Sequence, residues 1–140
     1  MVTAGIQNIP ISAMLNFAEH MDEIIICDIG FPIPREVEFV DLAVKDDVPT
    51  VEEVLDVVLE NFSVEKVVMA EEGEYYNPSF VKGIRGRFGE EIPFELIPHA
   101  ELKRRSHGVK GIIRTGSYTA NSNVLLVSGD SGKFHRECHG

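Results

Sequence analysis

Residues 23–28 read EIIICD, in which four consecutive apolar residues stand between two carboxylates. A run that is apolar on both faces is typical of a strand buried inside a sheet, and most often of a parallel one. Ile29-Gly30 and the proline-rich segment FPIP follow directly and provide the turn that ends it. We therefore expect a buried, parallel strand over residues 24–27, with Asp28 at its carboxyl end.

Helix and strand patterns alternate along the rest of the chain. Ser12 is expected to cap a short helix that ends at His20. Thr50-Val51-Glu52-Glu53 is a capping box that opens a helix with a 3.6-residue apolar period, and Asn77-Pro78 is typical of an N-cap followed by proline. The other expected elements are strands near 37–44, 66–70, 94–97, 111–115 and 124–128 and a helix over 99–106. This alternation predicts an α/β fold, a three-layer α/β/α sandwich with a parallel or mixed central sheet.

Length and charge limit the function. The chain has 140 residues, 44% of them hydrophobic, which fits one globular domain. Its 23 acidic and 13 basic residues give a formal net charge of −10. Nucleic-acid binding and binding to anionic membranes both need a basic surface, so we expect neither partner. A neutral ligand such as a sugar would not be repelled.

The lack of targeting signals and the contexts of the two cysteines predict a cytoplasmic protein. Aliphatic blocks such as Ile24–Cys27 are far shorter than the ~20 residues that a membrane-spanning helix needs. The amino terminus has no basic region and no continuous apolar core, so we expect no signal peptide. Cys27 lies in an apolar run and Cys138 in a polar tail. Such contrasting contexts argue against a disulfide and for a reducing compartment.

The first candidate site lies at the expected strand end. Ligands of open α/β sheets bind beyond the carboxyl ends of the strands, where Asp28 stands. His20, at the end of the preceding expected helix, is placed by the same reasoning near Asp28. A histidine favoured by the helix dipole and an aspartate that caps a turn are the alternative interpretation.

Three further polar groups are weaker candidates. Glu71 and Glu72 follow a strand, but neighbours in an extended chain point to opposite sides, so at most one would face a pocket. His99 and Lys103 share a face of an expected helix, which is also the pattern of a solvated helix. Asn121 and Asn123, with Tyr118 nearby, offer the donors and acceptors that a polyhydroxyl ligand needs, although any polar turn between strands has this composition.

Two other motifs do not lead to a function. Gly129-Asp130-Ser131-Gly132 matches the tetrapeptide around a trypsin-like nucleophile, but those enzymes are all-β. The segment 135–139, HRECH, holds metal-ligand types within one short piece of the tail, whereas structural zinc sites draw ligands from two segments. Gly-rich phosphate loops of the GxGxxG or P-loop type are absent from the sequence. We expect no metal and no cofactor.

The motifs taken in order resemble the D-ribose pyranase and L-fucose mutarotase family. Glu19-His20-Met21-Asp22 and the segment 26–34, ICDIGFPIP, are similar to that family's Gly-His-x-Asp and Cys-Asp-x-Gly-Leu-Pro-Ile-Pro. The likeness covers about residues 5 to 129 and favours the ribose pyranase branch. Its further matching segments are 41–43, 47–50, 70–72 with 77–78, 99–103, 113–116 and 123–126. The resemblance implies a sugar pyranase-like domain over residues 1–129 and a C-terminal tail over 130–140.

The resemblance also implies the roles of particular residues. The family's catalytic histidine falls on His20, its sugar-binding aspartate on Asp28 and its second histidine on His99. Its Tyr-x-Asn segment falls on Asn121-Ser122-Asn123, so the asparagine matches and the tyrosine does not. His20 is thus expected to be catalytic, with its substrate held by Asp28, His99, Lys103, Asn121 and Asn123.

The implied activity is a cofactor-independent isomerase that interconverts cyclic forms of D-ribose, or anomers of a reducing sugar, by acid/base ring opening. The implied partners are a monosaccharide, D-ribose or L-fucose, and further copies of the chain in a ring-shaped homo-oligomer, such as a decamer of two pentamers. Three alternatives stay open: an L-fucose mutarotase, a non-catalytic monosaccharide-binding accessory of a sugar uptake system, and a protein-interaction module.

Overall fold

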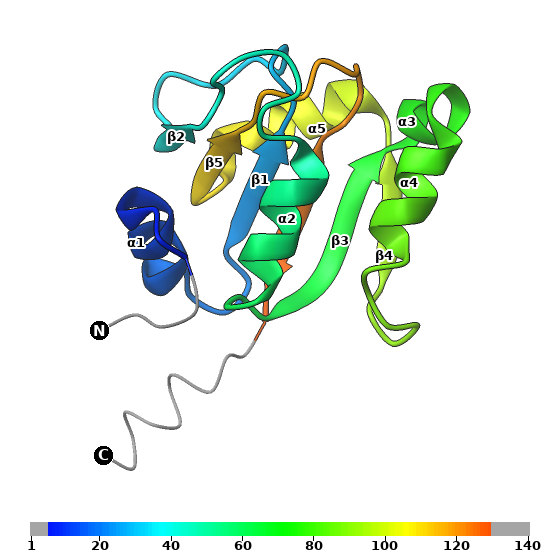
Figure 1. The fold of residues 1–140 in the computed structure, drawn as a ribbon. Helices are drawn as coiled ribbons and strands as arrows, with labels where there is room; N and C mark the ends of the chain where they lie inside the picture. The colour runs from blue at the N-terminus through cyan, green and yellow to red at the C-terminus, as the bar shows by residue number, and fades with distance from the viewer. Residues whose placement is uncertain (1–5, 130–140) are drawn as a thin grey trace.

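The computed structural model describes residues 6–129 of the chain. In this part, six strands form one sheet in the order β2-β5-β1-β6-β3-β4 (Figure 1). The strands are β1 (Glu23–Cys27), β2 (Phe39–Asp41), β3 (Val64–Ala70), β4 (Phe94–Ile97), β5 (Gly111–Arg114) and β6 (Val124–Ser128). The helices are α1 (Ile9–Phe17), α2 (Val51–Leu59), α3 (Glu71–Tyr76), α4 (Pro78–Arg85), α5 (His99–Arg105) and the short 3₁₀ turn η1 (Ser106–Gly108).

The sheet is mixed. Strand β1 runs parallel to β5 and antiparallel to β6, and β6 is also antiparallel to β3. Strands β2 and β4 pair in parallel with β5 and β3. The expectation of a parallel β1 is therefore right for one of its two neighbours. Because β6 alone is reversed, the carboxyl ends of β1, β3, β4 and β5 lie at one edge of the sheet, together with the start of β6.

Side chains of β1 alternate between two hydrophobic cores, as the two-residue period of a strand requires. Ile24 and Ile26 pack with the apolar faces of α1, α2 and α4. Ile25 and Cys27 pack on the opposite face with Leu102 of α5. These four side chains are fully buried. The result is the expected three-layer α/β/α sandwich, in which Figure 1 shows α2 in front of the sheet.

Two helix starts follow the sequence signals and one does not. Thr50 caps α2 with the expected capping box, in which its hydroxyl accepts the Glu53 N–H at 3.1 Å. Helix α4 starts at Pro78 as expected, although the Asn77 side chain makes no capping hydrogen bond. The first helix is capped by Asn8 instead of Ser12, because Asn8 Oδ1 accepts the Ile11 N–H at 3.0 Å. It ends at Phe17, so His20 lies beyond it in a turn.

Helix α3 is a further correction to the expected elements. Glu71 and Glu72 do not continue an extended chain, since they begin this helix immediately after β3.

In the described residues 6–129, no helix combines the length and apolar character that crossing a membrane would need.

Candidate active site

A cavity of about 320 Å³ lies at the carboxyl edge of the sheet. It is bounded by the segment that follows β1, by the first turn of α5 and by the loop that enters β6. Five of the six site residues expected from the sequence line it: Asp28, His99, Lys103, Asn121 and Asn123. The sheet brings them together because β1 and β4 end at this edge and antiparallel β6 begins there. His20 is the exception.

Asp28 is the buried carboxyl of the cavity. It is 6% exposed, and its two oxygens accept the backbone N–H groups of Gly30 at 3.0 Å and Ser122 at 3.2 Å. Burial raises the pKa of Asp28, and the two backbone hydrogen bonds oppose that rise without cancelling it. The carboxyl is thus fixed in direction and holds a proton more readily than an exposed aspartate.

The loop before β6 holds the backbone at Asp28. Asn123 is 1% exposed, and its side-chain oxygen accepts the backbone N–H of Asp28 at 2.8 Å. Asn121 has a φ of 61°, the left-handed region in which asparagine is among the few tolerated residues. The two asparagines therefore differ in role, since Asn123 secures the backbone at Asp28 while Asn121 shapes the loop and the cavity wall.

His99 begins α5 and offers an unused nitrogen. Its backbone N–H donates to Glu72 Oε1 at 2.9 Å, and its ring meets Phe31 edge to face with 6.1 Å between ring centres. The Nδ1 atom is buried and has no hydrogen-bond partner. Burial lowers the pKa of His99, and the nearby Lys103 ammonium lowers it further against the opposing charges of Glu72 and Asp28. This favours the neutral imidazole.

Sequence reasoning missed two of these neighbours. Glu72 was expected to be a solvated or pocket carboxylate, but it accepts the first N–H of α5 and thereby fixes the start of the helix that carries His99. Phe31 is buried against the His99 ring. Neither contact has a local signal, because each joins segments far apart in the chain. Tyr118, which stands in the polar turn noted above, lines the cavity and is 69% exposed.

His20 lies at the other end of β1, which corrects the expectation that it neighbours Asp28. It precedes the strand and Asp28 follows it, so the five strand residues separate the two. At about 3.3 Å per residue this is a distance on the order of 15 Å. The His20 side chain is 53% exposed, and its Nε2 lies 3.0 Å from Glu65 Oε2. Within one chain, His20 does not reach the cavity.

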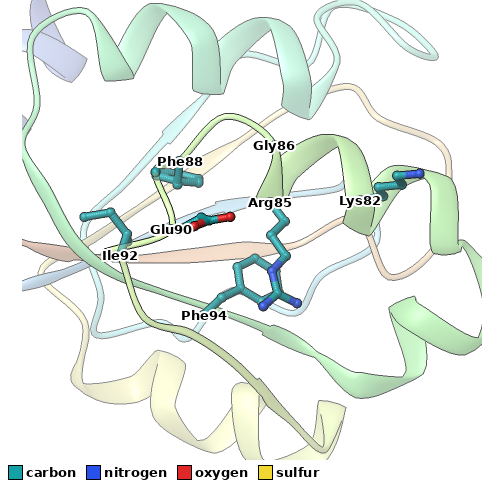
Figure 2. A pocket seen from close by; sticks show the side chains of 8 residues that line it. Lys82, Arg85, Gly86, Phe88, Glu90, Ile92 and Phe94 are labelled. Carbon is teal, nitrogen blue, oxygen red and sulfur yellow. The ribbon is translucent and has the colours of Figure 1, made fainter.

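A larger hollow of about 560 Å³ offers less chemistry. It lies between the end of α4 and the loop to β4, and Figure 2 shows Arg85 over Phe94, whose ring centre is 5.0 Å from the guanidinium carbon. Its charged side chains, Lys82, Arg85 and Glu90, are all exposed. It contains no buried titratable group among its lining residues, so the smaller cavity at Asp28 is the candidate active site.

Metal binding has no support in the described part of the chain. Among residues 6–129, no group of three or more histidine, cysteine, aspartate or glutamate side chains is arranged to hold a metal ion. The motif at residues 135–139 and the tail 130–140 lie outside the described residues, as does most of the segment 129–132.

Known proteins resemble this chain over almost its whole length. A curated D-ribose pyranase of Streptococcus agalactiae is 36% identical over 129 residues, which cover 92% of this chain and 98% of that protein. The structure of Bacillus subtilis RbsD complexed with D-ribose superposes with a TM-score of 0.86 at 33% identity, covering 92% of this chain and 98% of the other.

A more distant structure shares the fold. The fucose mutarotase from Streptococcus pneumoniae, in complex with L-fucose, has a TM-score of 0.68 at 17% identity and covers 87% of this chain and 92% of its own. The model of the RbsD / FucU transport protein family matches residues 1–130. The chain therefore belongs to the RbsD / FucU family.

Proposed function

We propose that this protein is an isomerase that interconverts the β-pyranose and β-furanose forms of D-ribose. The observation that carries the proposal is the cavity of about 320 Å³, in which a buried carboxyl, an imidazole with a free nitrogen and two amides converge. This is the donor and acceptor set that a polyhydroxyl ligand requires. Similarity along almost the whole chain to a D-ribose pyranase and to an RbsD that binds D-ribose supports ribose as the substrate.

The reaction needs only proton transfers. Ring opening removes the proton from the anomeric hydroxyl and delivers one to the ring oxygen, so that the C1–O5 bond breaks and an aldehyde forms. Rotation about the chain then lets the C4 hydroxyl attack the aldehyde, and the same transfers in reverse close the furanose. General acid–base groups placed within hydrogen-bond reach accelerate such steps by about 10²- to 10⁴-fold.

The cavity residues divide this work. Asp28, whose pKa is raised by burial, is fixed by two backbone hydrogen bonds and binds a sugar hydroxyl. His99, neutral and with Nδ1 unpartnered, hydrogen-bonds a second hydroxyl. Lys103, Asn121 and Asn123 bind the remaining hydroxyls. Histidine is the side chain best suited to exchange protons at neutral pH, and that role falls to His20.

His20 serves this cavity from a second copy of the chain. Because the length of β1 separates it from Asp28 of its own chain, and because its side chain is half exposed, it points to a neighbour and not inward. An assembly in which the amino edge of one sheet meets the carboxyl edge of the next completes the site. Such a head-to-tail contact gives a ring when its rotation closes on itself, and we propose that closed ring as the homo-oligomer. A cytoplasmic location stays part of this proposal.

Asn121 gives weight to one alternative. It stands where the resemblance implies a tyrosine, and Tyr118 is the tyrosine on this cavity wall. If Tyr118 does not replace the missing ring, the protein binds a monosaccharide without interconverting its forms. An L-fucose mutarotase is a second alternative, which differs in substrate and not in mechanism.

Saturation-transfer proton NMR tests the three possibilities. D-ribose and L-fucose are each examined with and without protein, and magnetisation exchange between the signals of their cyclic forms is measured. Faster pyranose–furanose exchange in D-ribose is the expected result. Faster exchange between fucose anomers alone would favour the mutarotase, while saturable binding of ribose with exchange at the uncatalysed rate would favour the binding accessory.

A further inference from the structure

The residues around His20 form a second arrangement, at the amino edge of the sheet, that the proposed function does not explain. His20 Nε2 lies 3.0 Å from Glu65 Oε2, although the two residues are 45 positions apart in the chain. The side chains are 53% and 44% exposed, so the contact is not imposed by packing in a core. Exposed ion pairs contribute little to stability, and stability therefore does not account for this one.

The backbone on the histidine side is held in a tight turn. The Asp22 N–H donates to Glu19 O at 3.0 Å and closes a four-residue turn with His20 at its second position. Met21, at the third position, has a φ of 77°, where glycine is the usual residue. The Met21 N–H donates to Ser128 O at 2.8 Å, which ties the turn to the end of β6. A non-glycine residue in this region is strained and marks a position that the surroundings determine.

The backbone on the glutamate side is irregular at the matching place. The register of β3 against β6 shifts between Val64 and Lys66, which leaves Glu65 as the extra residue of a β-bulge. A bulge turns a side chain away from the direction that a regular strand would give it. The Gly129 N–H donates to Ser63 O at 2.9 Å and joins the end of β6 to this segment. The end of β6 thus holds both the turn with His20 and the bulge with Glu65.

We propose that Glu65 is a positioning residue for His20, which holds the imidazole by its Nε2–H and leaves Nδ1 to exchange the proton with the sugar. This inference rests on the proposed function for its chemistry. A carboxylate only accepts hydrogen bonds, so the ring nitrogen that faces it carries the hydrogen. The neutral ring then presents a lone pair at Nδ1, ready to accept a proton, and the protonated ring presents Nδ1–H, ready to donate one. A carboxylate that fixes the tautomer of a catalytic histidine works in this way in the serine-protease triad.

The chain contains a matched control. His107 Nδ1 lies 2.7 Å from Glu36 Oε1, in a histidine–glutamate pair with side-chain exposures of 63% and 60%. Neither residue lines the cavity at Asp28. Glu36→Gln therefore makes the same chemical change to a similar exposed pair without touching His20.

The test compares Glu65→Gln with Glu36→Gln in two measurements. The first is exchange of D-ribose forms by saturation transfer, for which we expect Glu65→Gln to lower kcat by about 10- to 100-fold with little change in KM, as for other partners of functional histidines. Glu36→Gln should behave like the unmodified protein. Equal kcat values for the two variants, or a loss confined to KM in Glu65→Gln, would overturn the proposal.

The second measurement reads the histidine directly. Imidazole ¹⁵N spectra distinguish the two neutral tautomers, and the His20 signals are those that disappear in His20→Ala. We expect the Nε2–H tautomer in the unmodified protein and in Glu36→Gln, and loss of that preference in Glu65→Gln. An unchanged His20 spectrum in Glu65→Gln would overturn the proposal. This readout needs no sugar, so it tests Glu65 even if the protein fails to interconvert ribose forms.

Discussion

The two ends of strand β1 present opposite kinds of functional group. At the carboxyl end, Asp28 is 6% exposed, hydrogen-bonded to the backbone and part of a cavity. At the amino end, His20 is 53% exposed, lies in a turn and contacts Glu65. Under the proposed function, the carboxyl end binds the sugar and the amino end supplies the group that transfers the proton.

The difference follows from the topology of the sheet. Parallel strands gather their carboxyl ends at one edge, so one chain can build a polar pocket there. His20, at the opposite edge, lines neither this cavity nor the hollow beside α4. The two ends of β1 lie at opposite edges of the sheet (Figure 1). The proposed function therefore needs a contact between two copies to bring His20 to the cavity at Asp28.

The largest expected effect on activity comes from disabling one end of β1 in one variant and the other end in a second variant, and then mixing the two. His20→Ala should fold and lose about 10²- to 10⁴-fold in ribose exchange, the contribution of a general acid–base group. Asp28→Asn should fold and lower the exchange by weakening ribose binding. His20 is exposed, and Asp28→Asn keeps the size of the side chain while removing the acceptor of one of the two backbone N–H groups. When the two variants are dissociated, mixed equally and reassembled, about a quarter of the sites should combine an intact His20 with an intact Asp28. Activity is measured by saturation transfer.

The control for this experiment mixes His20→Ala with the double variant His20→Ala/Asp28→Asn, because that mixture contains no intact His20. Recovery only in the first mixture would establish that each site takes residues from two copies. Equal activity in both mixtures would mean that His20 and Asp28 of different copies do not act together. The proposal of a site shared between two copies would then be wrong.

A smaller effect, on the free energy of unfolding, is expected when a hydrogen bond at the Asp28 end of β1 is removed. Asn123→Ala removes the acceptor of the Asp28 N–H, which is held at 2.8 Å in a buried position. A buried donor left without a partner costs about 1–3 kcal/mol, so the free energy of unfolding should fall by that amount in urea titrations. Asn61→Ala, at an exposed position, should change it by no more than about 0.5 kcal/mol. Similar values for both variants would show that the Asn123 contact does not secure Asp28.

The elements with strong local signals are the ones that the sequence predicts well. Strand β1 and helix α2 carry a continuous apolar run and a capping box, and both form as expected. Helix α3 was missed because EEGEYY has no apolar period and contains a glycine, so its conformation depends on what precedes and follows it. Asn8 replaces Ser12 as the cap of α1, since Pro10 fits the first turn of a helix and thus allows an earlier start.

The candidate site divides in the same way. Asp28 lines the cavity as the strand-end argument predicts, whereas His99 and Asn123 were weak candidates until the family resemblance added them. His20 was placed beside Asp28, although it precedes β1 and Asp28 follows it, so the length of the strand puts the two residues at opposite edges of the sheet. Its contact with Glu65 depends on the bulge in β3 and on the pairing of β6, which no local pattern records.

The smallest effect concerns the electrostatics of the pocket, and it has no counterpart at the exposed end. Burial, and then the charge of Lys103, lower the pKa of His99 below its ordinary value of 6.5. The unfolded chain therefore binds a proton at His99 more readily than the folded protein does. This residue makes the folded protein more stable as pH rises from the lowered pKa of His99 to about 6.5, with no further gain above.

Lys103→Met should raise the pKa of His99 only part of the way, because burial is the larger cause, and should narrow that pH range. Titration of the His99 ring by NMR measures the shift, urea unfolding across the same pH values measures the stability, and Arg104→Met is the control from the next position on α5. An unchanged His99 titration in Lys103→Met would mean that solvent screens the Lys103 charge, so that burial alone keeps the imidazole neutral in the pocket.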